Sequence, residues 1–166
     1  TFTLTNGTFN LNGYSASTSF GTFVTSAGTK NITFNGGTIA IGSSGTSAFN
    51  NAQPTGFTTT AGTGTGTISL TSASAKTFVG AGSTFNCTLN QGGAGALTIS
   101  GSNTFNNITA SYISTGATTI TFTASTTTTL ASFTAIGNAT NTLTINSSTS
   151  GTAANLSLSS GTVSVD

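Results

Sequence analysis

Short apolar-x-apolar pairs recur along this chain at intervals much longer than a hairpin. Seven of them form one series: GTFNL (7–11), GTIAI (37–41), GTISL (66–70), GALTI (95–99), TTITF (118–122), NTLTI (141–145) and GTVSV (161–165). Their first apolar residues are separated by 30, 29, 29, 23, 23 and 20 residues. Residues two apart share one face of a strand, so each pair predicts a strand with two inward side chains. The intervals predict stacked coils.

Stacking would align these pairs into two apolar columns inside the molecule. The first predicted column is Phe9, Ile39, Ile68, Leu97, Ile120, Leu143 and Val163, and the second is Leu11, Ile41, Leu70, Ile99, Phe122, Ile145 and Val165. Further pairs are also expected to point inward, each beginning seven or ten residues before a member of the first column: Phe2 with Leu4, Ile32 with Phe34, Cys87 with Leu89, Ala110 with Tyr112, Phe133 with Ala135 and Leu156 with Leu158. The chain contains twelve Phe, which we expect to belong to this core.

The pattern favours an all-β parallel β-solenoid, with a right-handed β-helix as the preferred form. We expect about seven coils with three short sides each, and loops at about 13–30, 43–57 and 72–83. The alternative is a β-sandwich filament subunit completed by a strand from a neighbour. The sandwich gives no reason for two aligned columns. We expect residues 1–166 to form a single solenoid segment that is open at both ends and is a slice of a longer chain.

The surface of such a molecule would be almost free of charge. Lys30, Lys76 and Asp166 are the only side chains with a formal charge, and the net charge is +1. Near-zero charge removes the usual repulsion between copies, so we expect a homo-oligomer or association with other chains of a larger assembly. The sequence offers no basic patch for nucleic acid and no apolar run for membrane insertion. Neither partner is expected.

The sequence also lacks the groups that catalysis requires. It contains no His, one acidic residue and one Cys, so no acid/base pair, activated nucleophile or ordinary metal site can be assembled. We therefore expect no enzyme activity, no catalytic residues, no metal and no cofactor. Cys87 is interpreted as a small buried hydrophobe. Gly-rich stretches such as GTGTG (62–66) are interpreted as turns.

Two surface features are candidates for contacts. Tyr14, near the first expected loop, is the one aromatic residue that we predict to be exposed and available to a partner. Rows of outward threonines are also expected, at Thr8, Thr38, Thr67, Thr119, Thr142 and Thr162. Such an array occurs in ice-binding solenoids. The competing interpretation is that Thr is simply a good strand former, and Ala96 interrupts the row.

The repeats resemble a known class of structural protein. GTFNLNGYSA (7–16), GSTFNCTLN (82–90) and SGSNTFNNITAS (100–111) are similar to the repetitive right-handed β-helix segments of tailed-phage fibres and other virion appendages. They also resemble repeats of autotransporter-like adhesins. The resemblance implies a structural role at the virion surface or outside the cell, with contacts to a cell-surface receptor made by loops. A bacterial or archaeal surface filament is the alternative function.

Overall fold

The computed structural model describes residues 1–14, 16–161 and 163–165, with side chains described for 1–14 and 20–161. The strands of this part pair almost entirely in parallel and stack as a β-solenoid of about six turns. The only helix among the described residues is the short 3₁₀ helix η1 (Ser111–Ser114). The all-β solenoid prediction is therefore confirmed.

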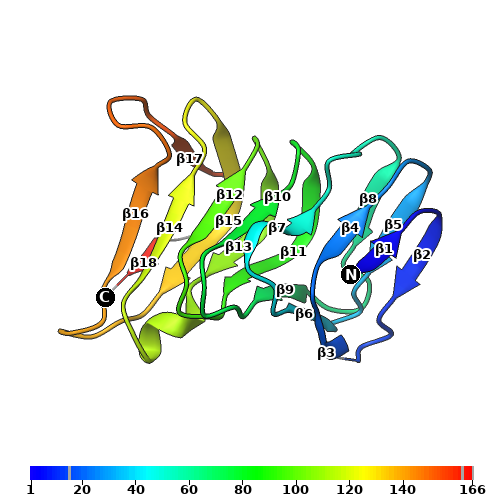
Figure 1. Cartoon of the computed structure of the whole chain (residues 1–166), viewed down its shortest axis with the longest axis horizontal. Helices are drawn as coiled ribbons and strands as arrows, with labels where there is room; N and C mark the ends of the chain where they lie inside the picture. The colour runs from blue at the N-terminus through cyan, green and yellow to red at the C-terminus, as the bar shows by residue number, and fades with distance from the viewer. Residues whose placement is uncertain (15, 162, 166) are drawn as a thin grey trace.

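Three sheets run along the solenoid axis. The first sheet contains β1 (Phe2–Leu4), β4 (Phe23–Thr25), β7 (Gly45–Asn50), β10 (Lys76–Val79), β12 (Leu97–Ser100), β14 (Thr118–Phe122) and β16 (Leu143–Ser147). The second contains β2 (Gly7–Asn10), β5 (Lys30–Thr33) and β8 (Phe57–Thr60). The third contains β3 (Ala16–Phe20), β6 (Thr38–Ile41), β9 (Gly66–Leu70), β11 (Thr84–Gln91), β13 (Thr104–Thr109), β15 (Thr127–Ala135), β17 (Asn155–Leu158) and β18 (Val163–Val165). Figure 1 shows β1 and β2 near one end of the long axis and β16 near the other.

The long strands β11, β13 and β15 each serve two sides of a coil. The pairing register shifts within β11–β13, between Phe85 and Thr88, which marks the bend between the two halves of β11. The first half of β11 continues the second sheet, because Thr59 Oγ1 accepts from the Asn86 amide at 2.7 Å. The halves of β15 pair separately with β17 and β18. Each coil therefore has three sides, as the sequence predicts.

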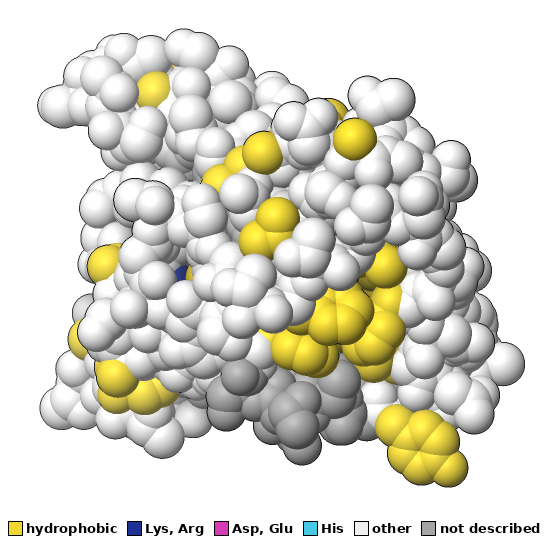
Figure 2. Space-filling view, turned by 45° about the vertical axis from the view of Figure 1, so that its right-hand side comes forward, with side chains coloured by type: hydrophobic (Ala, Val, Ile, Leu, Met, Phe, Trp, Pro, Cys, Tyr) yellow, Lys and Arg dark blue, Asp and Glu magenta, His cyan; other side chains and the backbone are white. Residues whose placement is uncertain are grey.

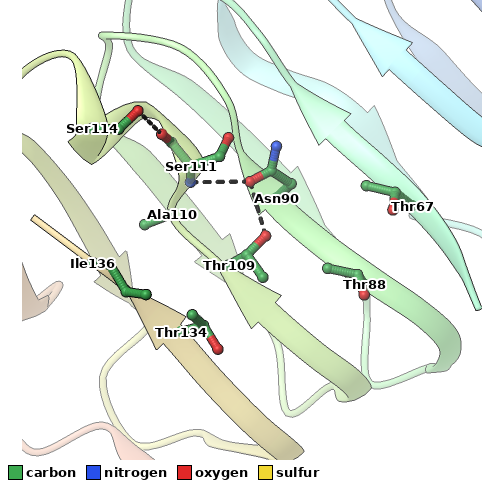
Figure 3. Close-up of a pocket in the computed structure, with 9 residues that line it drawn as sticks. All are labelled: Thr67, Thr88, Asn90, Thr109, Ala110, Ser111, Ser114, Thr134 and Ile136. Carbon is green, nitrogen blue, oxygen red and sulfur yellow. Dashed lines mark hydrogen bonds between the residues drawn. The ribbon is translucent and has the colours of Figure 1, made fainter. Parts of the chain in front are cut away.

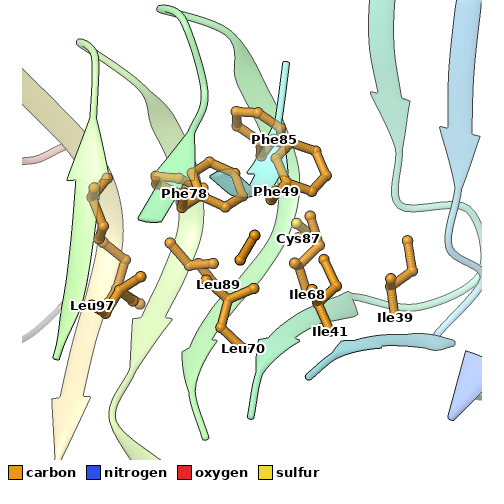
Figure 4. Close-up of a cluster of buried hydrophobic side chains, with 14 of the residues drawn as sticks. Ile39, Ile41, Phe49, Ile68, Leu70, Phe78, Phe85, Cys87, Leu89 and Leu97 are labelled. Carbon is orange, nitrogen blue, oxygen red and sulfur yellow. The ribbon is translucent and has the colours of Figure 1, made fainter. Parts of the chain in front are cut away.

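Phenylalanine side chains form much of the interior. Phe23, Phe49 and Phe78 are neighbours in the first sheet and stack nearly parallel, with ring centroids 5.3 and 4.5 Å apart. Phe85 meets Phe49 and Phe78 edge-on from the facing side. Figure 4 shows the rings gathered together, while Ile and Leu side chains lie along β6, β9 and β11. All twelve Phe lie in the core or pack against it.

Amides fill the corners where the chain turns between sheets. Asn103 is fully buried, donates to the carbonyls of Ser100 and Gly101 at 2.9 and 3.1 Å, and accepts from the Gly82 amide at 3.0 Å. A Cβ at Gly80 would lie 2.2 Å from Asn103 Oδ1, so this close approach requires glycine. The buried Asn103 side chain thus adds hydrogen bonds to the backbone groups of this corner.

The predicted pairs do not form two continuous columns, and this prediction was wrong. Ile39 neighbours Ile68 and Leu97 neighbours Ile120, but Ile68 is followed in its sheet by Leu89. Successive partners on the third side are Ile39, Ile68, Leu89, Ile108, Phe133 and Val163, which are 29, 21, 19, 25 and 30 residues apart. Because the number of residues per coil varies along the chain, the residues of one predicted column lie on different sides of the solenoid.

The predicted core residues therefore divide among the three sheets. Leu11, Ile39, Ile41, Ile68, Leu70, Leu97, Ile99, Ile120 and Phe122 are buried, while Phe9 and Leu143 are partly buried against the core. Phe9 neighbours Ile32 in the second sheet. Ile120 neighbours Ile145, which is 45 % exposed in the last coil. The side chains of Val163 and Val165 lie outside the described residues.

Three segments that we expected to be loops contribute whole sides of coils. Residues 13–30 contain β3 and β4, residues 43–57 contain β7, and residues 72–83 contain β10. Among the described side chains of these strands, the buried positions hold Phe23 and Thr25 in β4, Ala48 and Phe49 in β7, and Lys76 and Phe78 in β10, so none of the three has a pair of aliphatic residues two apart. Tyr112 was predicted to point inward, but it is only partly buried in η1, and the next residue, Ile113, is buried instead.

Candidate functional site

The solenoid keeps its lysines inside. Lys30 is fully buried and Lys76 is 1 % exposed. Each begins a strand and lies two residues before an inward apolar residue, Ile32 or Phe78. The period-2 alternation of the strand therefore turns both lysines inward. The exterior formed by the described side chains carries hydroxyl, amide and apolar groups but no lysine.

Backbone carbonyls hold both ammonium groups. Lys30 Nζ donates to the Gly28 and Thr55 carbonyls at 2.8 and 2.9 Å. Lys76 Nζ donates to the Gly95 and Ser72 carbonyls at 2.6 and 3.0 Å, with the Gly93 carbonyl at 3.5 Å. Burial lowers the pKa of Lys76 to about 8. These contacts join neighbouring coils, so we interpret the lysines as buried residues that stabilise the stacking of the coils.

A shallow groove of about 520 Å³ lies on the third sheet. Its lining residues come from four successive coils and from both ends of η1: Thr67, Thr88, Asn90, Thr109, Ala110, Ser111, Ser114, Thr134 and Ile136. Figure 3 shows Asn90 and Thr109 on the sheet and Ser111 and Ser114 on η1 to one side. Ile136 is 57 % exposed at the groove. The lining contains no charged or titratable side chain.

A hydrogen-bond network holds the groove together. Asn90 Oδ1 accepts from Thr109 Oγ1 at 2.9 Å and from the Ser111 amide at 3.2 Å, and Asn90 Nδ2 donates to Ser69 Oγ at 3.1 Å. Ser114 Oγ donates to the Ser111 carbonyl at 2.9 Å (Figure 3). The polar groups thus bind one another across coils. The groove has the chemistry of a neutral contact surface.

Tyr14 lies away from this groove. It is 74 % exposed, in the turn between β2 and β3, and its amide donates to the Leu11 carbonyl at 2.9 Å. Its exposure agrees with the sequence prediction, and its role as a contact stays a prediction. Cys87 is buried among the core residues, and burial raises its thiol pKa above the ordinary value. A protonated, buried thiol is a poor nucleophile.

The predicted single threonine row is not formed, and this prediction was wrong. Thr8 lies in the second sheet, Thr38 and Thr67 are neighbours in the third, and Thr119 lies in the first. Thr142 precedes β16, and Thr162 lies outside the described residues. Each of these threonines directly precedes a residue of the first predicted column. Because coil length varies, the threonines are distributed over the three sides in the same way as that column.

The groove and the buried lysines were not predicted from the sequence. The signal for the lysines is local: KNI and KTF place each lysine in phase with an inward residue. The groove depends on which coils are adjacent, and Asn90, Thr109 and Thr134 become neighbours only through a register that the sequence intervals do not give. No local pattern identifies it.

Within the described part of the chain, no three residues of the His, Cys, Asp and Glu types gather as a metal site would require. Among the same residues, the structure has no helix long and apolar enough to cross a membrane. Comparison with known proteins gives no matching family model, no matching curated protein and no matching solved structure. The chain is, by its fold, a β-solenoid repeat protein.

Proposed function

We propose that this chain is a non-enzymatic structural segment that forms part of a rod, in an extracellular fibre or a virion appendage. The observation that carries the proposal is the axial continuity of the molecule. One parallel sheet of seven strands runs through it, and the stack of Phe23, Phe49 and Phe78 follows the same direction. Backbone ladders bond each coil to the next, and ring contacts from Phe2 to Phe105 add to them, which suits a part that transmits load along its axis.

The chemistry of the surface supports the same role. Both lysines are inside, the groove on the third sheet has a neutral lining, and the sequence contains no His and one acidic residue. Apart from the tyrosines, the described exterior carries no ionisable side chain, so its side-chain charge changes little around neutral pH and it offers no carboxylate, imidazole or lysine for acid/base catalysis. Constancy of this kind is useful in a part exposed to varied external conditions. Contact with a cell-surface receptor is then a task for projecting residues such as Tyr14.

Immunogold labelling of source material tests the proposal. Antibodies raised against the folded chain are applied to intact virions and to cells carrying surface filaments, with pre-immune serum as the control. We expect gold along rods that project from particles. Gold along cell-attached filaments would instead support the surface-filament alternative. Labelling confined to the cell interior would overturn the proposal.

A further inference from the structure

Asparagine is followed directly by glycine three times in this chain, at Asn6, Asn12 and Asn35. In this dipeptide the glycine nitrogen can attack the asparagine side chain, because glycine has no Cβ to hinder the approach. The sequence alone therefore gives three equivalent candidates for spontaneous deamidation. The structure separates them, because the reacting groups of each dipeptide have different hydrogen-bond partners.

Two of the three dipeptides adopt the same backbone conformation. Asn12 and Gly13 lie in the turn after β2, with φ of 49° and 79°. Asn35 and Gly36 lie in the equivalent turn after β5, with φ of 49° and 80°. One backbone hydrogen bond closes each turn, at 2.9 Å in the first and 2.8 Å in the second. A difference in reactivity between them must then come from contacts outside the turn.

Hydrogen bonds restrain both reacting groups at Asn35. The amide of Gly36, which would be the attacking nitrogen, donates to the Gly64 carbonyl at 2.9 Å. Asn35 Oδ1 accepts from the Thr63 amide at 3.1 Å, and Asn35 Nδ2 donates to Asn10 Oδ1 at 3.1 Å. The nitrogen and the side-chain amide are thus each held away from reaction by a partner in a neighbouring coil.

Asn6 is restrained in a similar way. The Gly7 amide donates to the Thr29 carbonyl at 2.9 Å, and Asn6 Oδ1 accepts from the Thr29 amide at 3.1 Å. A Cβ at Gly28 would lie 2.3 Å from Asn6 Oδ1, so the following coil packs directly against this side chain. Although Asn6 is exposed to solvent, its amide group is therefore fixed on the backbone.

Asn12 has neither of these restraints. It is exposed, and its own amide donates to Asn10 Oδ1 at 2.9 Å. Among the described residues, its side chain has no hydrogen-bond partner and the Gly13 amide has no acceptor. At the other two sites the partners of the glycine amide and of Oδ1 come from the following coil. That coil also lies beside Asn12, so the difference is local to this turn.

We propose that Asn12 is a site of spontaneous deamidation in the folded protein, and that Asn6 and Asn35 are protected. The Gly13 nitrogen loses its proton to hydroxide and attacks Asn12 Cγ. The new N–Cγ bond forms, the Cγ–Nδ2 bond breaks, and Nδ2 leaves as ammonia after taking a proton from water. A second water molecule hydrolyses the resulting succinimide at either carbonyl, which gives aspartate or isoaspartate. Water is the only co-reactant.

The rate of this reaction depends on local opening of the chain. The glycine nitrogen approaches Cγ only when the turn opens, so each hydrogen bond that must break slows the reaction. Opening at Asn6 or Asn35 breaks a bond to the glycine amide and a bond to Oδ1, and both of these are missing at Asn12. At ordinary hydrogen-bond strengths, two such bonds together change the rate by about tenfold or more.

The product places a carboxylate on a surface where the described residues have none. The one acidic residue of the sequence, Asp166, lies outside the described residues. Figure 2 shows one face of the molecule covered by hydrophobic and uncharged polar groups, without a visible acidic side chain. Isoaspartate also lengthens the main chain by one methylene, close to Tyr14, which is 74 % exposed. Deamidation therefore gives Tyr14 a negatively charged neighbour.

Incubation of the folded protein at mildly alkaline pH, with samples taken over several weeks, tests the proposal. Each sample is digested with pepsin at acid pH, where deamidation is slow. Cleavage after Phe9, Tyr14 and Phe34 places the three asparagines on separate peptides. Mass spectrometry measures the gain of one dalton in each peptide, and enzymatic methylation of isoaspartate provides an independent count. A parallel sample in guanidinium chloride gives the rate of each dipeptide without structure.

We expect Asn12 in the folded protein to react at least about tenfold faster than Asn6 and Asn35. In guanidinium chloride the three rates should be similar. Asn12→Gly is the matched control, because glycine adopts the positive φ of this turn without strain. This variant should lose the fast reaction and the isoaspartate signal, while Asn6 and Asn35 keep their rates. Circular dichroism checks that the variant is folded.

Two results would overturn the proposal. If Asn6 or Asn35 reacts as fast as Asn12 in the folded protein, the hydrogen bonds to the following coil do not control deamidation. If no peptide gains mass in the folded protein while all three do so in guanidinium chloride, the turn at Asn12 is as well protected as the other sites. Neither result affects the structural role proposed above, which immunogold labelling tests separately.

Discussion

Lys76 shows how this fold accommodates an ionic group inside a neutral core. Its ammonium group lies where the chain turns into the first sheet, and it donates to the carbonyls of Ser72 and Gly95. The Ser72 carbonyl also accepts from the Gly95 amide at 3.3 Å, and the Gly95 carbonyl also accepts from Gln91 Nε2, so the ammonium group is a second donor to each. The cost is desolvation of the charge, which lowers the pKa of Lys76 from 10.5 to about 8.

Lys76 should therefore make the protein more stable as the pH rises from about 8 to about 10.5. In that range the unfolded chain binds more protons at this residue than the folded chain, so the free energy of unfolding increases with pH. Cys87 acts in the opposite direction above its ordinary pKa of 9.0, because burial keeps its thiol protonated in the folded state. Cys87→Ala removes that opposing effect.

Urea denaturation of Cys87→Ala at several pH values measures the contribution. We expect its midpoint to rise between pH about 8 and about 10, and the double variant Cys87→Ala/Lys76→Met to lose that rise. The double variant should also be less stable throughout, since the carbonyls of Ser72 and Gly95 each lose one of their donors. A midpoint that falls equally in both proteins over this range would contradict the assignment.

At the scale of elements, the stack of phenylalanines in the first sheet is the main axial contact of the core. Phe49 lies in its middle, with ring centroids 5.3 Å from Phe23 and 4.5 Å from Phe78. The ring is fully buried and also meets Phe85 at 5.7 Å. Loss of one ring would therefore leave a cavity between two coils.

Phe49→Ala should lower the free energy of unfolding by about 3–5 kcal/mol, the usual cost of removing a buried aromatic side chain. Phe9→Ala is the matched control, because Phe9 is only partly buried in the first coil. We expect its cost to be clearly smaller. Urea denaturation of both variants provides the comparison, and equal losses would show that the stack is not the main axial contact.

Asn90→Ala should loosen the groove and η1. Asn90 contacts Ser69, Thr109 and the Ser111 amide, so its removal should lower the free energy of unfolding by about 1–3 kcal/mol. Hydrogen exchange of the Ser111 amide should become faster. Thr88→Ala is the control, since Thr88 Oγ1 has only a 3.4 Å contact with Asn107. Unchanged exchange at Ser111 in Asn90→Ala would count against this role.

The sequence predicts the architecture better than it predicts the register. Inward pairs such as Ile39 with Ile41 and Leu97 with Ile99 are local period-2 patterns, and they correctly indicate short strands with a buried face. Which coils are adjacent depends on the number of residues per turn, and that number changes along the chain. The groove and the split threonine row follow from coil adjacency, so local patterns could not predict them. The burial of the lysines could have been predicted, because each lies two residues before an inward apolar residue of the same strand.

At the scale of the whole molecule, all three sides of the solenoid are built in the same way. Every main ladder joins a strand to its equivalent one turn away, and long-range contacts therefore follow the axis. The stability of the solenoid then depends on these axial contacts.

The parallel register between coils is the central claim, and disulfide trapping tests it most directly. Thr98 and Thr121 are outward neighbours on β12 and β14, between the buried pairs Leu97 with Ile99 and Ile120 with Phe122. Adjacent parallel strands lie about 4.8 Å apart, within the reach of a disulfide.

In a Cys87→Ala background, Thr98→Cys with Thr121→Cys should therefore form a disulfide under mild oxidation, as measured by free-thiol titration and mass spectrometry. The control pair Thr98→Cys with Thr123→Cys is displaced by two residues, to roughly 8 Å, and should remain reduced. Efficient trapping of the control pair, with free thiols in the first pair, would contradict the stacked parallel solenoid.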